Sequence, residues 1–287
     1  MEAGIDISGK ILILWLGLVL TASGLPAAVS GDSPAGSGAG KASLCPDRAY
    51  LKSYLTDTRD LLKSPLHWNR LDYLEAGLLA GATVGLYTRD GEIRDWAQRK
   101  RDSKSDHLAN FAKPFGNGAY TLPPLAALYL YGHLSGRDKP RRTALLGLES
   151  YIFADVITGL LKDIGHRHRP SSGDSYSRWD GPSLSTSNQS FPSGHSTAAF
   201  ALLTVIASEY GDRPYIPTLA LGIASLTALS RVNDNDHWAS DVLFGSAIGY
   251  FTARAILRLH KVDSNSRITI FPQLDYRHAG LSIALRR

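Results

Sequence analysis

The sequence contains almost no cysteine, since Cys45 is the only one among its 287 residues. A single thiol can form neither an intramolecular disulfide nor a cysteine metal cluster. Neither sign of charge is in large excess, because 31 basic and 26 acidic residues leave a formal net charge of +5. This small excess favours anionic ligands without specifying one. The basic residues are not interleaved with aromatic residues along one stripe, which argues against a nucleic-acid partner.

Long uninterrupted apolar runs are scarce as well, and the mean hydropathy is -0.11. Most apolar stretches after about residue 47 are shorter than the roughly 20 residues that cross a bilayer. They are rich in Ala, Leu and Gly, and polar or Pro-bearing segments separate them. The pattern predicts an all-α fold, a bundle of about six core helices. The six stretches are residues 76–87, 119–134, 144–161, 197–208, 216–229 and 242–257.

The two ends of the chain differ from this central pattern. An apolar run at 11–20 follows Lys10, and small residues follow at 28–30, which is typical of a secretory signal peptide; an uncleaved anchor helix is the alternative. Short apolar segments at 268–271 and 281–285 flank a polar turn and predict a β-hairpin. We therefore expect four parts: a signal peptide at 1–30, a flexible linker at 31–46, a helical domain at 47–262 and a C-terminal hairpin extension at 263–287.

A first motif, KDIGHRHRP, occupies residues 162–170. Lys162 and Arg169 are two helical turns apart, so on a continuous helix they would project from one face and clamp an oxyanion. Pro170 would end that helix. The alternative is an ordinary basic helix end, which the negative end of the helix dipole favours.

A second motif, FPSGH, occupies residues 191–195 and leads into a helix that we expect to begin near Ser196. Unpaired backbone amides at such a helix start bind anions. Gly194 lets the backbone approach a phosphate closely, and Ser193 adds a hydroxyl donor. His195 titrates near neutrality and could protonate a leaving oxygen. The alternative is a capped helix start with a surface histidine.

A third motif, SRVNDNDHWASD, occupies residues 230–241. His237 and Asp241 are four residues apart and would be neighbours on one helical turn. The carboxylate could then hold the imidazole N–H and leave the other ring nitrogen free to attack. Arg231 offers a further guanidinium for phosphate. The alternative is a capping Asn/Asp cluster followed by a surface ion pair.

The three motifs together read K-x(6)-R-P, then P-S-G-H, then S-R-x(5)-H-x(3)-D. This order resembles the signature of the type 2 phosphatidic acid phosphatase superfamily, which also holds bacterial class A acid phosphatases and vanadium haloperoxidases. The resemblance covers roughly residues 71–260. His166 and His168 fall at variable positions of the first motif, so we expect them outside the direct contacts of the site.

The resemblance implies a role for each matching residue. His237 would be the nucleophile that forms a phosphohistidine, His195 the general acid, and Asp241 the group that orients His237. The implied phosphate-binding residues are Lys162, Arg169, Ser193, Gly194 and Arg231. Three cations and backbone amides suit the charge that a phosphoryl group carries during transfer. In an up-and-down bundle the connections that bear the motifs emerge at one end, so the motifs can converge.

These features predict a phosphatase that needs no metal or other cofactor and hydrolyses phosphate monoesters or diphosphates. Its substrate would be a phosphorylated lipid or a small phosphate ester, and vanadate would inhibit it. No metal ligands are expected beside the motifs, where Asp234 and Asp236 are interpreted as solvated loop acids. One alternative is a haloperoxidase that uses vanadate as its cofactor. Another is a non-catalytic membrane or scaffold protein built on the same bundle.

The amino terminus and the charges within the apolar stretches predict the location. An exported, periplasmic protein that is soluble or peripherally attached to a membrane is favoured. Glu149 and Asp155 interrupt the third stretch, and a charge at mid-bilayer costs about 2.5–3.5 kcal/mol on insertion scales. The alternative is an integral inner-membrane protein, since residues 114–136 are long and uncharged enough to span. The sequence leaves the oligomeric state open.

Overall fold

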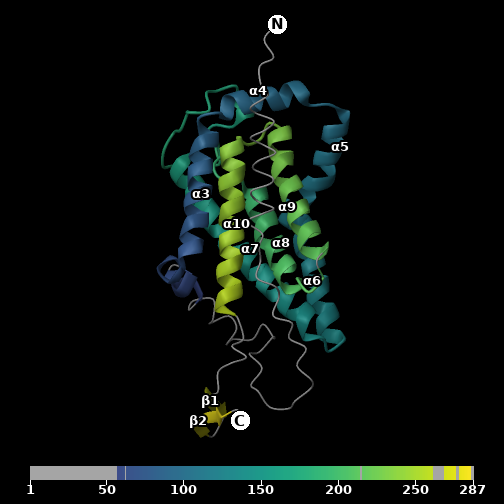
Figure 1. Cartoon of the computed structure of the whole chain (residues 1–287), viewed down its shortest axis with the longest axis vertical. Helices are drawn as coiled ribbons and strands as arrows, with labels where there is room; N and C mark the ends of the chain where they lie inside the picture. Colours follow the sequence, from purple (N-terminus) through teal and green to yellow (C-terminus); the bar gives the residue numbers. More distant parts are fainter. Residues whose placement is uncertain (1–56, 62, 214, 261–267, 276–277, 286–287) are drawn as a thin grey trace.

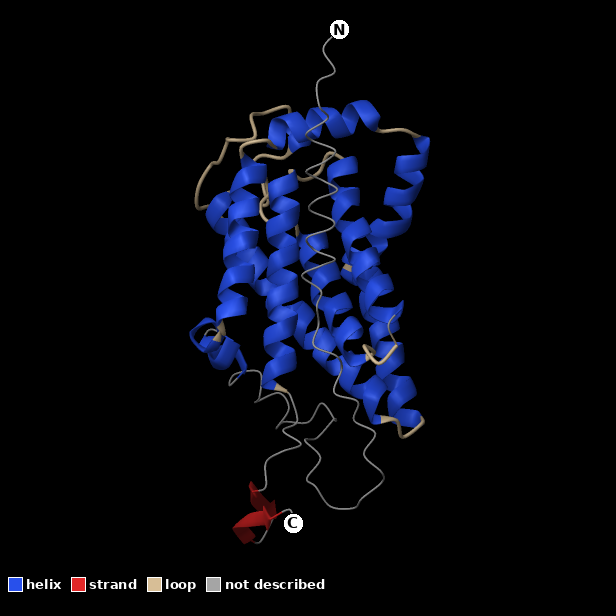
Figure 2. Ribbon diagram, in the orientation of Figure 1, coloured by secondary structure: helices blue, strands red, loops and turns tan. Residues whose placement is uncertain are grey.

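The structure is a computed structural model that describes residues 57–61, 63–213 and 215–260 and the backbone of 268–275 and 278–285. The predicted signal peptide at 1–30 and linker at 31–46 lie outside the described residues. Helices dominate the described chain, as predicted (Figure 1, Figure 2). The named elements are the 3₁₀ helices η1 (Ser64–His67), η2 (Lys113–Gly116) and η3 (Pro170–Ser172), the helices α3 (Arg70–Tyr87), α4 (Asp90–Lys100), α5 (Ser103–Ala112), α6 (Gly118–Leu134), α7 (Asp138–Gly165), α8 (Gly194–Glu209), α9 (Tyr215–Asn233) and α10 (Ala239–Leu259), and the strands β1 (Ile268–Asp275) and β2 (His278–Leu285).

Each of the six predicted apolar stretches lies inside one helix, namely α3, α6, α7, α8, α9 or α10. The helices extend beyond the apolar stretches because their ends are polar and capped. At the start of α3 the Asn69 side chain accepts hydrogen bonds from the Leu71 and Asp72 amides, and the Asp72 carboxylate accepts one from the Asn69 amide. This reciprocal capping box satisfies amides that have no partner within the helix.

The core is centred on α8, which packs against α7, α9 and α10. Its side chains are buried over most of its length. Two glycines of α10 permit this approach. A Cβ on Gly245 would lie 2.5 Å from the Ser193 carbonyl oxygen, and one on Gly249 would collide with the Thr197 carbonyl oxygen. The start of α8 therefore lies directly against the first turns of α10, which brings the second and third motifs together.

A polar helix that the apolar pattern does not predict, α4, lies across one end of the bundle (Figure 1). The same end holds the last turn of α7 and the first turns of α8 and α10. The Asp90 carboxylate at the start of α4 accepts a hydrogen bond from the Ser240 amide at 3.0 Å, which fixes α4 to α10. We call this end, defined by Asp90, Lys162, Ser193 and Asp241, the motif end.

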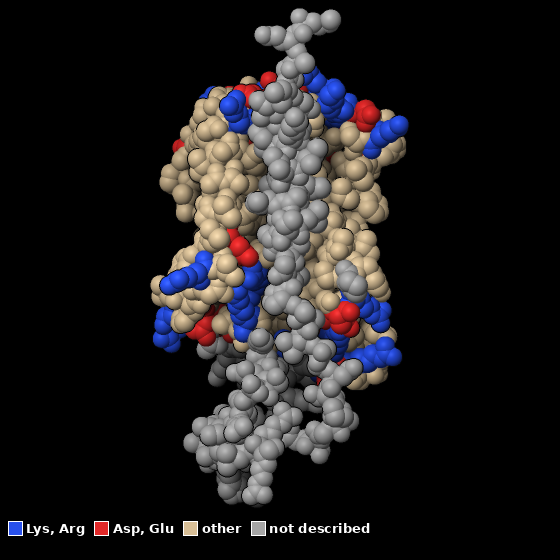
Figure 3. All heavy atoms as spheres, viewed as in Figure 1, with Lys and Arg blue, Asp and Glu red and all other residues tan. Residues whose placement is uncertain are grey.

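The expectation of a soluble or peripheral bundle is wrong. Among the described residues, α7, α9 and α10 are long and apolar enough to cross a membrane. Along α7 a row of large apolar side chains faces outward at every fourth residue: Ile152, Val156, Leu160 and Ile164. In the view of Figure 3, charged residues gather near the two ends of the bundle and leave an uncharged band between them. These are the features of an integral membrane protein.

Glu149 was expected to oppose insertion of this segment into a membrane, but its side chain does not face outward. It is fully buried, and its carboxylate accepts a hydrogen bond from His260 at 3.2 Å. A paired carboxylate inside the bundle is shielded from lipid by its neighbouring helices. The apolar stretch at 144–161 also underestimates the length of this segment, because the helix α7 that contains it has 28 residues. Helix length, rather than the apolar run alone, decides whether a segment can span.

The C-terminal strands form the predicted hairpin. β1 and β2 pair antiparallel in a register that runs from Ile268 opposite Leu285 to Asp275 opposite His278. Both strands are longer than the apolar segments at 268–271 and 281–285, since the ladder continues toward the turn on either side.

Candidate active site

The first motif does not form one helical face, contrary to expectation. α7 ends at Gly165, and His166 adopts a left-handed conformation (φ 46°) that turns the chain back. Lys162 is therefore in the last turn of α7, whereas Arg169 follows the turn and precedes η3. The Lys162 ammonium donates to the Gln189 carbonyl oxygen at 2.6 Å. The two cations come together through a fold of the chain rather than through helical spacing.

The two histidines inside the first motif support the loop, as expected of positions outside the direct contacts. His166 Nε2 lies 2.7 Å from the Ser185 carbonyl oxygen. His168 Nδ1 lies 2.7 Å from Asp174 and its Nε2 lies 2.9 Å from Asp180. These contacts tie together the segment between α7 and α8.

The second motif begins its helix at Gly194, slightly before the expected Ser196. Ser193 precedes the first turn and is fully buried, and its amide donates to the Asp241 carbonyl oxygen at 3.1 Å. Its hydroxyl oxygen accepts from the Ser196 hydroxyl at 3.0 Å. A hydroxyl that accepts in this way keeps its own proton for a phosphate oxygen. The Lys162 side chain reaches the same helix start, since a Cβ on Gly194 would lie 3.9 Å from Lys162 Cε.

His195 follows in the first turn of α8, close to the cations of the other motifs. Burial, followed by the charges of Arg231, Arg169 and Lys162, lowers the pKa of His195 to about 4, although the Asp236 carboxylate opposes the shift. The imidazole is thus neutral at pH 7 in this charge environment. A dianionic phosphate would offset the three cations and favour the protonated form that a general acid needs.

His237 precedes α10, so it does not share a helical turn with Asp241 as the spacing predicts. The separation between His237 Nδ1 and Asp241 Oδ2 is 4.0 Å, which is too long for the predicted hydrogen bond. Instead Nδ1 lies 2.6 Å from the Ser190 carbonyl oxygen. A carbonyl only accepts, so Nδ1 carries the proton and Nε2 has a free lone pair. Burial, followed by the charge of Lys162, lowers the pKa of His237 well below 6.5.

Asp241 acts on His237 through Ser190. Its Oδ2 accepts hydrogen bonds from the Ser190 hydroxyl at 2.6 Å and from the Trp238 amide at 3.0 Å. These bonds fix both the carbonyl that orients the imidazole and the backbone that follows it. The carboxylate therefore orients the His237 imidazole indirectly, which is a correction to the predicted direct contact.

Arg167 and Asp90 are structural members of the site that the motif analysis misses. The fully buried Arg167 guanidinium donates to Asp241 Oδ1 at 2.5 Å and to Asp90 Oδ2 at 2.8 Å. Burial raises the pKa of Asp90 to about 6, although the Arg167 charge opposes the rise. Arg167 was hidden at a variable motif position, and Asp90 lies far upstream. The available signal was a third basic side chain in the first motif, beside Lys162 and Arg169, which needs buried acceptors if it is not exposed.

Asp234 and Asp236 are not simply solvated loop acids. Asp234 Oδ2 accepts from Arg231 at 3.2 Å and from Lys113 at 3.2 Å. Asp236 pairs with the Arg231 guanidinium and lies 3.9 Å from Arg169. The loop after α9 folds back over its own last turn, which brings both acids to the phosphate-binding arginines. A phosphate at these arginines would compete with the two carboxylates.

The three motifs therefore converge at one end of the bundle, as predicted. Each of the three cations influences the charge state of both His195 and His237. The unprotonated ring nitrogen of His237, the start of α8 and the guanidinium groups belong to one cluster, in which His237 and Arg231 are buried and Arg169 is partly exposed. Such a cluster can meet a phosphate with a nucleophile, amide donors and positive charge at once.

Comparison with known proteins agrees with this geometry. Residues 143–264 match the family model of the PAP2 superfamily, and all three motifs lie inside the match. The match covers 122 of the 287 residues. It begins within α7, downstream of the region from residue 71 that the motif resemblance suggested.

Three curated proteins are similar to parts of the chain. The chain is 48% identical over 65 residues to a lipid A 1-phosphatase of Porphyromonas gingivalis, covering 22% of this chain and 15% of that protein. It is 26% identical to a probable diacylglycerol pyrophosphate phosphatase of Schizosaccharomyces pombe, covering 55% and 64%. It is 26% identical to a lipid A 1-phosphatase of Rhizobium johnstonii, covering 50% and 63%. The chain thus spans less than two thirds of the length of each of these relatives.

One solved structure is also similar, the transmembrane PAP2 type phosphatidylglycerolphosphate phosphatase from Bacillus subtilis. The TM-score is 0.49 at 19% sequence identity, and the match covers 76% of this chain and 98% of that one.

Proposed function

We propose that the chain is a membrane-integral phosphatase that hydrolyses the phosphate monoester or diphosphate of a lipid. The observation that carries the proposal is the state of His237, whose Nδ1 donates to the Ser190 carbonyl and whose Nε2 is left unprotonated among three cations. A lipid substrate is supported by the names of the curated relatives, a lipid A 1-phosphatase and a probable diacylglycerol pyrophosphate phosphatase, and by the helices that can cross a membrane.

The reaction that this arrangement supports has two steps. His237 Nε2 attacks the phosphorus atom, the bond between phosphorus and the ester oxygen breaks, and His195 gives its proton to the leaving oxygen. A water molecule then attacks the phosphohistidine, His195 takes a proton from that water, and inorganic phosphate leaves with His237 restored. Lys162, Arg169, Arg231 and the start of α8 would stabilise the charge on the equatorial oxygens in both steps.

The chemistry needs no metal in this proposal. The positive charge that a metal would supply comes from the three side chains, and the acids beside them are already paired with Arg231 and Lys113. Vanadate, which adopts the trigonal-bipyramidal shape of the transition state, would therefore occupy the site and inhibit turnover.

The test is phosphate release by the full chain in detergent micelles. The substrates are a long-chain lipid phosphate, a lipid diphosphate and a water-soluble aryl phosphate, each with and without vanadate. We expect the lipid substrates to have the higher kcat/KM and vanadate to block all three. A parallel assay supplies vanadate, bromide and peroxide. Halide oxidation without phosphate release would overturn the proposal in favour of a haloperoxidase, and inactivity in both assays would favour a non-catalytic protein.

A further inference from the structure

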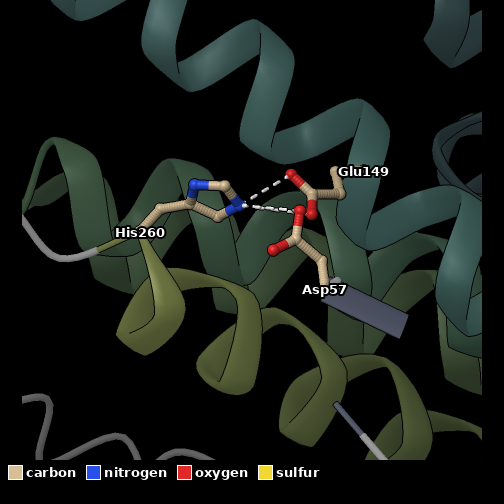
Figure 4. Close-up of side chains that lie close together, drawn as sticks. All are labelled: Asp57, Glu149 and His260. Carbon is tan, nitrogen blue, oxygen red and sulfur yellow. Dashed lines mark hydrogen bonds and ion pairs between the residues drawn. The ribbon is translucent and has the colours of Figure 1, made fainter. Parts of the chain in front are cut away.

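Three ionisable side chains meet at the end of the bundle opposite the motif end (Figure 4). Asp57 lies in the helical stretch at residues 57–61, Glu149 lies in α7, and His260 follows the last turn of α10. His260 Nε2 is 3.1 Å from Glu149 Oε2 and 3.8 Å from Asp57 Oδ2. One ligand atom from each residue lies within 4.8 Å of the other two. We call these residues the far-end triad.

With Asp57 and Glu149 both ionised, the triad contains more acceptors than its members can satisfy. Glu149 is fully buried, and its Oε2 has no hydrogen-bond donor within the described residues, because the His260 contact with hydrogen-bond geometry goes to Oε1 at 3.2 Å. Asp57 Oδ2 is likewise buried without a donor among these residues. Two carboxylates and a single imidazole leave an excess of negative charge. A buried carboxylate oxygen without a donor is costly, so the pattern indicates a missing cation.

In the part of the chain that the structure describes, no lysine or arginine side chain donates to Glu149 Oε2 or Asp57 Oδ2. The guanidinium of Arg142 donates to the His260 carbonyl oxygen at 2.9 Å and to Glu209 at 3.2 Å. It therefore contacts the backbone of the triad but is engaged away from the Asp57 and Glu149 carboxylates. In Figure 4 the two carboxylates lie beside each other, and the His260 ring faces both.

The ligand set selects a class of metal. Mg²⁺ and Ca²⁺ prefer oxygen ligands alone, whereas imidazole together with carboxylate suits Zn²⁺ and its neighbours. A tetrahedral zinc with bonds of about 2.0–2.2 Å holds its ligand atoms about 3.3–3.6 Å apart. The nitrogen-to-oxygen separations of 3.1 and 3.8 Å lie on either side of that range. Small rotations of the side chains would bring all three atoms to one ion.

We propose that Asp57, Glu149 and His260 bind a Zn²⁺ ion, with water as its fourth ligand. Binding releases the proton that His260 Nε2 shares with Glu149, since a metal ligand must be unprotonated. The ion joins a segment near the amino-terminal side of the chain to α7 and α10. It lies one length of α10, 21 residues or about 30 Å, from the motif end. Its role is thus to hold the helices together rather than to take part in phosphoryl transfer.

The test uses the full chain in detergent, stripped with a chelator and dialysed against metal-free buffer. Zn²⁺ is titrated in competition with a chromogenic zinc indicator, and Co²⁺ is titrated separately for its visible absorption, which reports coordination geometry. We expect one equivalent of zinc per chain, a tetrahedral cobalt spectrum and a raised thermal midpoint. Zinc binding without saturation at one equivalent, or an octahedral cobalt spectrum, would overturn the proposal.

Variants assign the binding to the triad. Glu149→Gln and His260→Gln should each weaken zinc affinity at least about 10-fold, the lower range for loss of a ligand-shell contact. Asp57→Asn should do the same, and it leaves the pair between Glu149 and His260 intact, so it remains informative if the other two variants misfold. Matched controls are Glu209→Gln at the same end and His107→Gln on α5. Equal losses in the controls and in the triad variants would refute the assignment, whatever the outcome of the phosphatase assays.

Discussion

The two ends of the bundle differ in charge and in how the chain assembles them. At the motif end, three cations lie around His195 and His237, and the groups come from three short sequence segments with regular spacing. At the far end, two carboxylates face one imidazole, and the three residues come from segments about 90 to 200 positions apart. Both clusters are buried and both need a counter-charge. A phosphate would supply it at the first end and a metal cation at the second.

Because the two ends differ in this way, we expect mutations at the motif end and at the far end to affect different properties of the protein. At the motif end the charged groups are arranged for an anion that enters and leaves, so their loss should appear in turnover. At the far end they connect three helical segments, so their loss should appear in stability. The predictions below test whether the two roles separate in this way.

The largest effect should come from His237→Ala. Its removal should lower kcat by at least about 10⁴-fold, because no neighbouring group can replace an in-line nucleophile. Phosphate release and acid-quench trapping of a labelled phosphoenzyme are the measurements. His107→Ala, a change to an exposed histidine, serves as the control. Residual turnover near the wild-type level in a variant with an unchanged thermal midpoint would remove His237 from the mechanism.

A smaller loss should follow from Arg167→Lys. Lysine keeps the charge but cannot donate to Asp241 and Asp90 together, so the support of the His237 loop loosens. We expect kcat to fall about 10²-fold, the scale of a misplacement of about 1 Å, while KM changes little. Arg178→Lys, in an exposed part of the same segment, is the control.

The same variant tests the indirect contact with the nucleophile. Arg167 should act through Asp241, so Arg167→Lys combined with Asp241→Asn should lose less than the product of the two single losses. Losses that multiply fully would show that the two residues act independently.

The sequence predicts the bundle well because apolar periodicity reports helices that bury one face. The expectation that the three motifs converge at one end of the bundle is also confirmed, because their connections emerge on the same side. Their local geometry is not predictable in the same way. The left-handed turn at His166 separates Lys162 from Arg169, and the start of α10 after His237 directs Nδ1 to the Ser190 carbonyl. Backbone conformation, which spacing does not reveal, decides both contacts.

Contacts between distant segments escape sequence reasoning altogether. Glu149 looked like an obstacle to membrane insertion because its partner, His260, is more than 100 residues away. Arg167 looked like a variable residue because its acceptor on α4 was not expected to reach it. In each case the partner of a buried charge lies far away in the sequence. Only the packing of α4, α7 and α10 reveals where these charges are satisfied.

A third prediction concerns the leaving group. His195→Gln should lower kcat/KM about 10²-fold for alkyl and lipid phosphates, which need a proton on the departing oxygen. Aryl phosphates, whose oxygen is less basic, should lose several-fold less. The comparison of both substrate classes on one enzyme preparation is the measurement. Equal losses for the two classes would argue that His195 binds phosphate without donating a proton.

A smaller effect is a shift in pH dependence. Because the pKa of His237 lies well below 6.5, its imidazole stays neutral as the pH falls below 6.5, until the pH approaches that lowered pKa. The acidic limb of the kcat/KM profile that reflects protonation of His237 should therefore lie below pH 6.5. Arg169→Gln removes one of the charges that lower this pKa, so the limb should move to higher pH relative to wild type on the same substrate. Arg178→Gln should leave it in place. A limb that stays fixed in the Arg169 variant would show that another group controls it.

Removal of the metal should have the smallest effect on turnover. This experiment is the most direct test of the proposal that the motif end determines turnover and the far end determines stability. If the ion binds only at the far-end triad, a chelator should lower the thermal midpoint by about 5 °C or more while kcat, measured well below the transition, stays within error. Zinc should restore the midpoint in wild type but not in His260→Gln. The midpoint of His260→Gln should also be insensitive to the chelator, because the variant has no ion to lose. Loss of kcat in a chelated protein that remains folded, with recovery on adding zinc, would instead place a metal in the phosphoryl-transfer chemistry.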